Sequence, residues 1–243
     1  DKVGSLWRNE KEWTIVFEGI QGKDKNDLST VDLPFGVDWK KDIKNLRVAY
    51  LKKDIEKDTT ETGDNLRNAI KSLKEMGIEP TAVEMPKEVP YRGFDIILRA
   101  EAGAFFDELV RSGDVDLMVE QSRRSRANSL RQSRFIPAVE YIQANRQRQV
   151  LIQKMHDLMK DYDVLISPTF GNDQLMATNL TGHPVIAVPT GLDDENHPTS
   201  MTFVGNLYDE ESILLLAKAF QDNTSFDELH PPGYWSSSIA GSQ

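Results

Sequence analysis

Five short apolar runs recur along this chain, and segments with helical spacing of apolar residues separate most of them. The runs are LRVAYL (46–51), TAVEM (81–85), DVLISPTF (163–170), VIAVP (185–189) and MTFVG (201–205). Strands that alternate with helices typically pair in one sheet, with parallel neighbours and helices on its faces. The sequence therefore predicts an α/β fold, a layered mixed sheet flanked by helices.

The intervening segments carry helix signals at their ends. Asn9 and Glu12 occupy capping-box positions before a segment that Gly22 closes. Apolar spacing predicts further helices over 66–76 and 94–109, a long helix from Pro137 through Met159, and a last helix that Asp209 caps. Residues 23–45 read as a surface loop, and NLTGHP (179–184) reads as the turn that leads into the strand at 185–189.

The length and composition of the chain limit the classes of protein to which it can belong. The 243 residues suffice for one domain with a sizeable core, and we expect a single domain over 1–243 whose pattern fades into an irregular tail at 223–243. A net charge of −10 argues against nucleic acid as a partner. No apolar run approaches the length of a membrane span, so we expect a soluble protein without a membrane partner. The absence of cysteine excludes disulfides and a thiolate nucleophile but leaves the compartment undetermined.

Familiar catalytic and metal-binding motifs are absent. The chain contains no G-x-S-x-G, S-x-x-K, H-E-x-x-H or glycine-rich phosphate loop. Three of its four histidines, His183, His197 and His230, directly precede proline, and no pair has metal-ligand spacing. We therefore predict no metal and no cofactor.

One segment departs from the acidic balance of the chain. QSRRSRANSLRQSR (121–134) holds five arginines and no acid. Arginine forks bind phosphate or carboxylate groups well, so the segment could be an anion site. The alternative is a solvated segment, or arginines that pair with acidic neighbours in the fold, and the sequence favours this second interpretation.

Several of these segments, in this order, resemble the amidase signature family. NLTGHPVIAVPTG (179–191) is similar to the family's N-[LA]-[TS]-G-x-P segment and the strand that follows it. DYDVLISPTF resembles the preceding D-x-[LI]-[LI]-x-P-T strand, and MTFVGNLYDEESILLLAKAF resembles the following strand and acid-capped helix. RFIPAVEYIQANRQRQVLIQKM looks like the family's long helix. DKVGSLWRNEKEWTIVFEGIQGKD looks like its D-x-x-G-P-x-x-R segment, although Ser5 replaces the usual proline and Glu12 stands near the usual aspartate.

The resemblance implies an amide hydrolase that works through a serine acyl-enzyme. In this family a serine nucleophile, a bridging serine and a lysine base lie in the N-terminal half. A serine needs a base to remove its proton, and a lysine can serve only where burial keeps it neutral. The resemblance covers about residues 1–225 and places this chain downstream of that group. We therefore expect the C-terminal portion of an amidase, with no catalytic residue of its own and no activity alone.

The resemblance also assigns this portion a wall of the substrate cleft. Open α/β sheets place ligands at the ends of their strands. The relevant ends here are the end of the strand that closes at Pro168 and the start of the strand that opens at Val185. The predicted substrate-binding residues are Thr169, Phe170, Asn179, Thr181, Gly182, His183 and Tyr141, with Asn145 and Arg146 as further candidates. Each has a structural alternative: Gly182 could set a turn, and the threonines could satisfy backbone groups.

Two alternatives to the hydrolase remain open. The chain could be a non-catalytic binding module derived from an amidase, or the A-type component of a tRNA-dependent amidotransferase. The second is disfavoured because the helix over 134–148 is not rich in aromatic residues and nothing in the sequence indicates a partner subunit. The expected partners are a small amide substrate, the N-terminal half of the same enzyme, and a second copy of the chain through an exposed sheet edge.

Overall fold

The computed structural model describes residues 4, 6, 9–230 and 232. The chain divides into two compact units, which are considered one at a time: a sheet unit, formed by residues 1–85 and 157–243, and a helical unit, formed by residues 86–156. Ser5 and most of the expected tail lie outside the described residues. The prediction of one domain over residues 1–243 stays a prediction.

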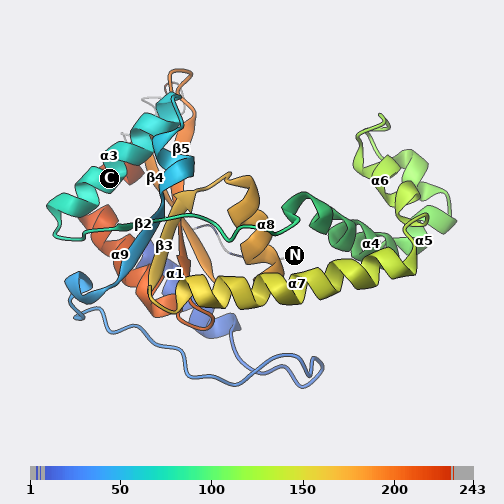
Figure 1. The fold of residues 1–243 in the computed structure, drawn as a ribbon, viewed down its shortest axis with the longest axis horizontal. Coiled ribbons are helices and arrows are strands. Elements are labelled where there is room, and N and C mark those ends of the chain that lie inside the picture. Colours follow the sequence, from blue (N-terminus) through green and yellow to red (C-terminus); the bar gives the residue numbers. More distant parts are fainter. Residues whose placement is uncertain (1–3, 5, 7–8, 231, 233–243) are drawn as a thin grey trace, which may run out of the picture. The chain divides into compact units, whose positions relative to one another are not determined.

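A five-stranded mixed sheet organises the sheet unit (Figure 1). Its strands are β1 (Val48–Leu51), β2 (Thr81–Val83), β3 (Val164–Pro168), β4 (Val185–Leu192) and β5 (Pro198–Gly205), in the order β2-β1-β3-β5-β4. β1 pairs in parallel with β2 and β3, whereas β5 runs antiparallel to both β3 and β4. The predicted α/β class and mixed sheet are thus confirmed.

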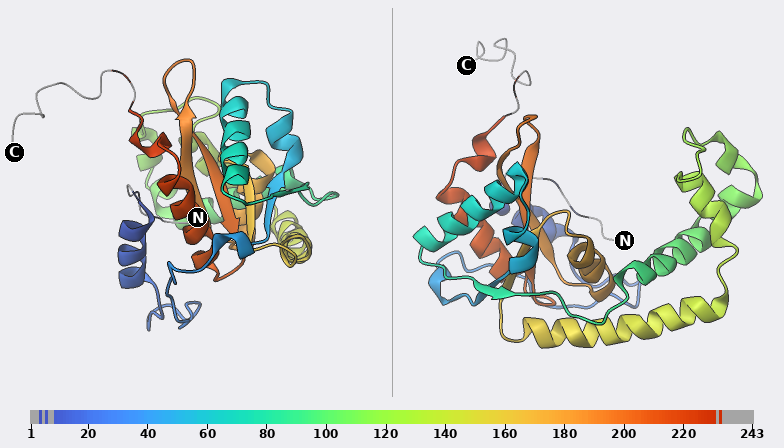
Figure 2. Two further views of the ribbon diagram at one scale, coloured as in Figure 1. Left: turned by 90° about the vertical axis from the view of Figure 1, so that its left-hand side faces the viewer. Right: turned by 45° about the horizontal axis from the view of Figure 1, so that its top comes forward.

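Helices lie on both sides of this sheet. The helices α3 (Glu61–Glu75) and α9 (Glu210–Asp222) lie on one side, and α8 (Asn172–Thr181) lies on the other (Figure 2). The main core forms between the sheet and the first side, where Leu66, Leu73, Phe203, Leu216 and Phe220 are fully buried. The unit also contains α1 (Glu10–Ile20), α2 (Lys52–Glu56) and the 3-10 turns η1 (Ile43–Asn45) and η4 (Phe226–Glu228).

Side-chain alternation gives the two faces of the sheet different chemistry. Ile166 of β3 and Phe203 of β5 face the apolar core, and the residues next to them in sequence face the side of α8. Ser167 and Thr202 are opposite one another in the register of β3 and β5, so both point to the α8 side. That face carries hydroxyl groups as well as apolar side chains.

The helical unit is built from short helices and one long one. It contains η2 (Tyr91–Phe94), α4 (Asp95–Phe105), α5 (Asp107–Arg111), η3 (Asp114–Leu117) and α6 (Arg126–Ser133), followed by α7 (Ala138–Met159), whose last residues belong to the sheet unit. A small core gathers Val115, Ala127 and Leu130. No helix in the described part of the chain is both long enough and apolar enough to cross a bilayer.

The predicted helix ends are confirmed where capping chemistry marks them. The Asn9 side chain accepts a hydrogen bond from the Glu12 backbone N–H, and Asp209 accepts one from that of Ser212. The helix predicted over 94–109 divides instead into α4 and α5, because Phe106 leaves the helical conformation. The loop expected at 179–181 is wrong: these residues form the last turn of α8, which Gly182 ends with φ of 90°.

Candidate functional site

A cluster of hydroxyl groups lies at the carboxyl end of β3. Thr169, the residue after the strand, accepts hydrogen bonds through Oγ1 from Ser200 Oγ at 2.9 Å and from Thr202 Oγ1 at 3.1 Å. Both donors lie on β5, which pairs with β3. The pairing of these two strands therefore holds the Thr169 hydroxyl in place.

The hydrogen bonds of Thr169 leave its own proton available. A hydroxyl has two acceptor lone pairs and one donor, and here the two donors from β5 occupy both lone pairs. No acceptor for the Thr169 O–H occurs among the residues that the structure describes, and the side chain is half-buried at the strand end. Linked hydrogen bonds polarise one another, so Thr169 presents a strengthened donor to an external acceptor.

Two buried polar atoms near this end of β3 have no hydrogen-bond partner among the described residues. Ser167 is fully buried and its Oγ is unpartnered. Gln174 of α8 is 2% exposed, and its Oε1 is unpartnered although its Nε2 lies 3.5 Å from Thr178 Oγ1. Most buried polar atoms are satisfied, so such atoms call for an explanation. Neither residue was predicted, and the only sequence signal is a serine inside the apolar run VLISP.

The structure separates the predicted residues around α8 into two groups. Thr169 and Phe170 precede the helix, and Phe170 is 87% exposed. Thr181, Gly182 and His183 lie at the far end of the helix, which has ten residues and is therefore about 15 Å long. Exposed Asn179 donates to the Leu175 carbonyl one turn earlier. α8 thus separates the two predicted strand-end groups instead of bringing them together.

The second group contains a buried threonine–histidine pair. Thr181 Oγ1 donates to the Ala177 carbonyl at 2.9 Å and lies 2.7 Å from Nδ1 of His183. Because the single hydroxyl proton is directed at the carbonyl, the His183 Nδ1 must carry the proton between the two side chains. This is the reverse of the arrangement in which a histidine removes a proton from a hydroxyl nucleophile.

Tyr141 belongs to the helical unit. Its hydroxyl donates to Glu101 Oε1 at 3.1 Å, linking α7 to α4. Asn145 donates through Nδ2 to the Tyr141 carbonyl, and Arg146 contacts Gln143 on the same helix. These contacts tie all three predicted side chains into helix α7 and its neighbour.

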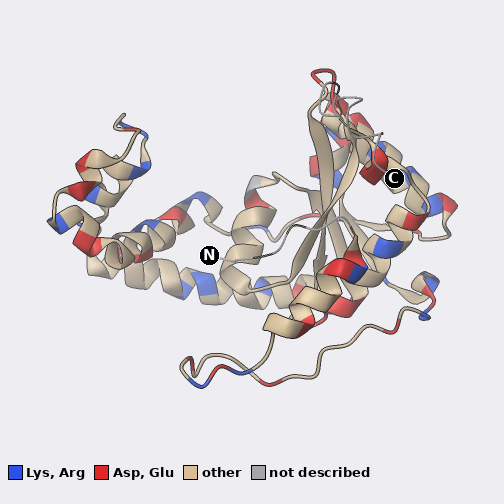
Figure 3. Ribbon diagram, turned by 180° about the vertical axis from the view of Figure 1, so that it is seen from behind, with Lys and Arg blue, Asp and Glu red and all other residues tan. Residues whose placement is uncertain are grey.

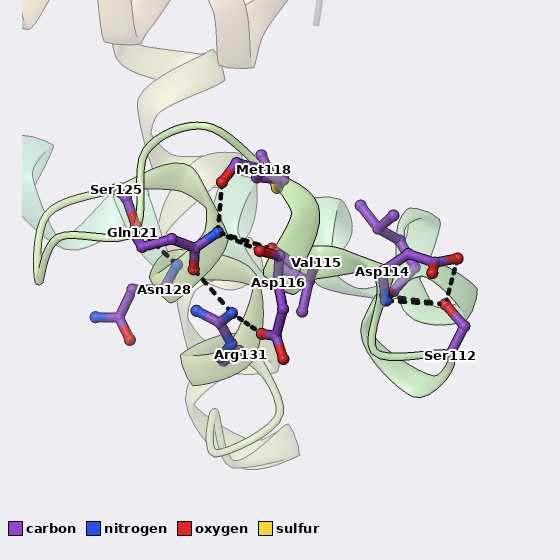
Figure 4. Close-up of polar contacts among 10 residues, drawn as sticks. Ser112, Asp114, Val115, Asp116, Met118, Gln121, Ser125, Asn128 and Arg131 are labelled. Carbon is purple, nitrogen blue, oxygen red and sulfur yellow. Dashed lines mark hydrogen bonds and ion pairs between the residues drawn. The ribbon is translucent and has the colours of Figure 1, made fainter.

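The basic segment forms α6 and the loop before it. Arg131 pairs with Asp116, and Arg134 pairs with Asp107. Gln121 accepts from Arg131 Nη2 at 3.0 Å and donates to the carbonyls of Val115 and Met118 (Figure 4). The pairing predicted for this segment is therefore confirmed for two arginines. No ion pair occurs within the described ranges for Arg123, Arg124 or Arg126. Basic and acidic residues are interspersed over the helical unit as a whole (Figure 3).

Acidic residues follow the three parallel strands at their carboxyl ends: Asp54 after β1, Glu84 after β2 and Asp173 after β3. Burial raises the pKa of Asp54 in α2 above its ordinary value; Lys53 opposes the shift, and the carboxylates of Asp173 and Glu84 add to it. The hydroxyl cluster beside β3 is itself uncharged. No group of three or more metal-ligating side chains occurs in the part of the chain that the structure describes. The cluster can therefore act on a ligand through neutral hydrogen bonds.

Curated relatives extend beyond this chain. The A subunit of glutamyl-tRNA(Gln) amidotransferase from Syntrophomonas wolfei is 26% identical over 282 aligned positions, which cover 96% of this chain and 57% of that protein. The protein of the same name from Staphylococcus haemolyticus is 28% identical and is covered to 56% of its length, with 95% of this chain aligned. The chain thus spans little more than half the length of the curated relatives that it matches.

Solved structures share the fold. The native peptide amidase of Stenotrophomonas maltophilia superposes with a TM-score of 0.75 at 18% identity, over 96% of this chain and 55% of that one. A bacterial aryl acylamidase of the amidase signature family gives a TM-score of 0.71 at 15% identity, over 93% of this chain and 53% of that one. The profile of the Amidase family matches residues 1–214, which is most of the sequence. The chain therefore belongs to the amidase family.

Proposed function

We propose that this chain supplies one wall of the substrate site of an amide hydrolase. Membership of the amidase family supports amide hydrolysis as the reaction class. The uncharged hydroxyl cluster at the end of β3 suits a neutral amide, which offers both a carbonyl acceptor and an N–H donor.

The observation that carries the proposal is the unused donor of Thr169. Its hydroxyl is fixed by two hydrogen bonds from β5 and has no acceptor of its own in the described structure. A substrate carbonyl would accept from this O–H, with Phe170 as an exposed apolar contact beside it. Thr181 and His183 would act by positioning the start of β4, since their hydrogen bonds join each other and α8. The roles of Asn179, Gly182 and Tyr141 stay predictions from the family resemblance.

The proposal assigns the serine nucleophile, the bridging serine and the lysine base to a polypeptide segment outside these 243 residues. Two observations support it: the relatives continue well beyond the aligned portion, and the Thr181–His183 pair has the wrong hydrogen-bond direction for nucleophile activation. On this basis the 243-residue chain alone is inactive, and its contribution is to bind and orient the amide.

Two measurements test the proposal. The isolated chain should neither hydrolyse a peptide amide nor react with a fluorophosphonate probe, and turnover by purified chain would overturn the assignment. In an active protein that contains this sequence, Thr169→Val should raise KM about tenfold, the value of one hydrogen bond of about 1.4 kcal/mol. Thr169→Ser retains the hydroxyl and serves as the matched control. Equal KM values for the two variants would refute the role of the Thr169 donor.

A second candidate function is that of the A-type component of an amidotransferase. The curated relatives at 25–28% identity carry this name, which favours it over the binding module. Glutamine would then be the amide, and a partner chain would receive the ammonia. The net charge of −10 makes direct contact of this chain with tRNA unfavourable. In an active protein that contains this sequence, ammonia release from glutamine that rises when a partner chain is added would select this candidate. Hydrolysis of peptide amides by that protein without a partner would select the first.

A further inference from the structure

A cavity in the helical unit gathers two arginines that the amide chemistry does not use. The cavity has a volume of about 490 Å³, and its lining includes Arg92 of η2, Arg99 of α4, and Gln132 of α6. Ligand-binding cavities in proteins usually measure about 300–1,000 Å³. Its size is therefore adequate for a small organic molecule.

The donors in this cavity are held in place but not fully used. Arg99 Nη2 donates to Gln132 Oε1 at 2.7 Å, which fixes both side chains. The buried Nε of Arg99 has no hydrogen-bond partner in the part of the chain that the structure describes. Neither the guanidinium of Arg92 nor the amide nitrogen of Gln132 has an acceptor within those same ranges. Such unmet donors around one cavity are the arrangement that binds an oxyanion.

The net charge and the lining residues of the cavity indicate which class of ligand it could bind. Asp95 is the only acid in the lining, and it lies 3.9 Å from Arg99 Nη1, with its side chain 55% exposed. Two arginines and one aspartate leave a single net positive charge, which matches a monoanion. The remaining walls include Ile136 and the ring of Phe135, which is 84% exposed. These residues favour a ligand with an apolar body over a bare inorganic anion.

We propose that this cavity binds a small monocarboxylate that carries an aromatic or branched apolar group. The carboxylate lies beside Arg92 and Arg99, where it accepts from the Arg92 guanidinium and the Gln132 amide, and the apolar body lies against Phe135. This site is independent of the amide-binding cluster, because it uses none of the same residues.

The test is a binding titration of the full 243-residue chain with 3-phenylpropionate, in which NMR or calorimetry detects binding. Saturable binding is expected, with little binding of the neutral 3-phenylpropanol or of inorganic phosphate. Arg92→Gln should weaken binding about tenfold, because a hydrogen bond between charged groups is lost. Arg99→Gln should also weaken binding, because Arg99 fixes the Gln132 side chain. Arg92 is exposed and unpaired in the described chain, so its variant is expected to fold normally.

Arg124→Gln is the matched control. Arg124 is exposed, lies outside the cavity, and its replacement changes the net charge by the same amount. The affinity of the Arg124→Gln variant for 3-phenylpropionate should equal that of the parent chain. The proposal is overturned if Arg92→Gln binds as tightly as Arg124→Gln, if the alcohol binds as well as the acid, or if phosphate competes at equal concentration.

Discussion

The hydroxyl of Thr181 and Nδ1 of His183 lie 2.7 Å apart in the interior, and we infer that the histidine nitrogen is the donor because Thr181 donates to the Ala177 carbonyl. Thr181 directs its own proton to the Ala177 carbonyl, so one threonine joins the end of α8 to the entry of β4. A hydroxyl next to a histidine is the pairing found in many catalytic sites. Here the direction of the hydrogen bonds instead gives the pair a structural role.

Thr181→Val is expected to lower the free energy of unfolding by about 1–3 kcal/mol, because the buried Nδ1–H of His183 loses this acceptor. Thr181→Ser keeps the hydroxyl and should cost less. Urea denaturation followed by circular dichroism measures both variants. Equal stability of the Val variant and the parent chain would contradict the inferred hydrogen bond.

Removing the Ser167 hydroxyl should change the free energy of unfolding less than removing a hydroxyl that forms a hydrogen bond. Ser167 Oγ is buried and unpartnered among the described atoms, so Ser167→Ala should leave the free energy of unfolding unchanged or raise it. Thr202 donates to Thr169, and Thr202→Val should cost about 1 kcal/mol. Thermal unfolding of the two variants compares them directly. A cost for Ser167→Ala as large as that for Thr202→Val would show that Ser167 has a partner.

Burial gives Glu10 a pH-dependent effect on stability. Burial chiefly raises the pKa of this carboxyl to about 7, and nearby Asp222 adds to the shift although Lys218 opposes it. The folded state then retains a proton that the unfolded state has released, so stability falls as pH rises from about 4.5 to 7. Glu10→Gln should match the parent chain at pH 4 and be more stable at pH 8, by at most about 3 kcal/mol.

Unfolding in urea at the two pH values measures this difference. The exposed Glu12 on the same helix turn provides the matched site for a Glu-to-Gln control, because its side chain is not buried. A Glu10→Gln difference that does not grow with pH would contradict the inferred burial of the charge.

Close contact between α4 and α6 depends on Gly103. A Cβ at this position would overlap the side chain of Ser133, including its Cβ. Gly103→Ala should therefore lower the free energy of unfolding by about 1–3 kcal/mol through overpacking. Adding Ser133→Gly should restore part of the loss, whereas adding Ser133→Ala should not. Gly19→Ala in α1, where no atom lies within 4 Å of the new Cβ, is the control and should be neutral or stabilising.

Local chemistry explains which parts of the fold were predictable. Asn9 and Asp209 each mark a helix start because their side chains accept backbone N–H groups nearby in sequence. α8 was missed because its sequence has weak helical periodicity, although Gly182 and the proline two residues later are typical of a helix end. The class and the mixed sheet follow from the apolar runs, which depend on burial and not on any single contact.

The candidate site was less predictable for a physical reason. Thr169 could be named from its position after a strand, but its two donors come from Ser200 and Thr202, about thirty residues away and in register only after β5 pairs with β3. The same holds for Arg131, whose acceptors Asp116 and Gln121 are positioned by the fold of the helical unit. Hydrogen bonds between distant segments are invisible to local patterns.

The free side of β4 predicts how the isolated chain behaves. β4 is a terminal strand of the sheet and pairs only with β5 in the described structure, and Val185 at its start is 41% exposed. Unpaired strand edges recruit other strands, so the isolated chain should self-associate as its concentration rises. Val185→Lys should reduce this association because a charge at an edge strand opposes pairing, whereas Val150→Lys on α7, also exposed, should not. Light scattering after size exclusion gives the mass of each species. A parent chain that remains a single species of 27.5 kDa at high concentration would show that this edge does not recruit a second copy.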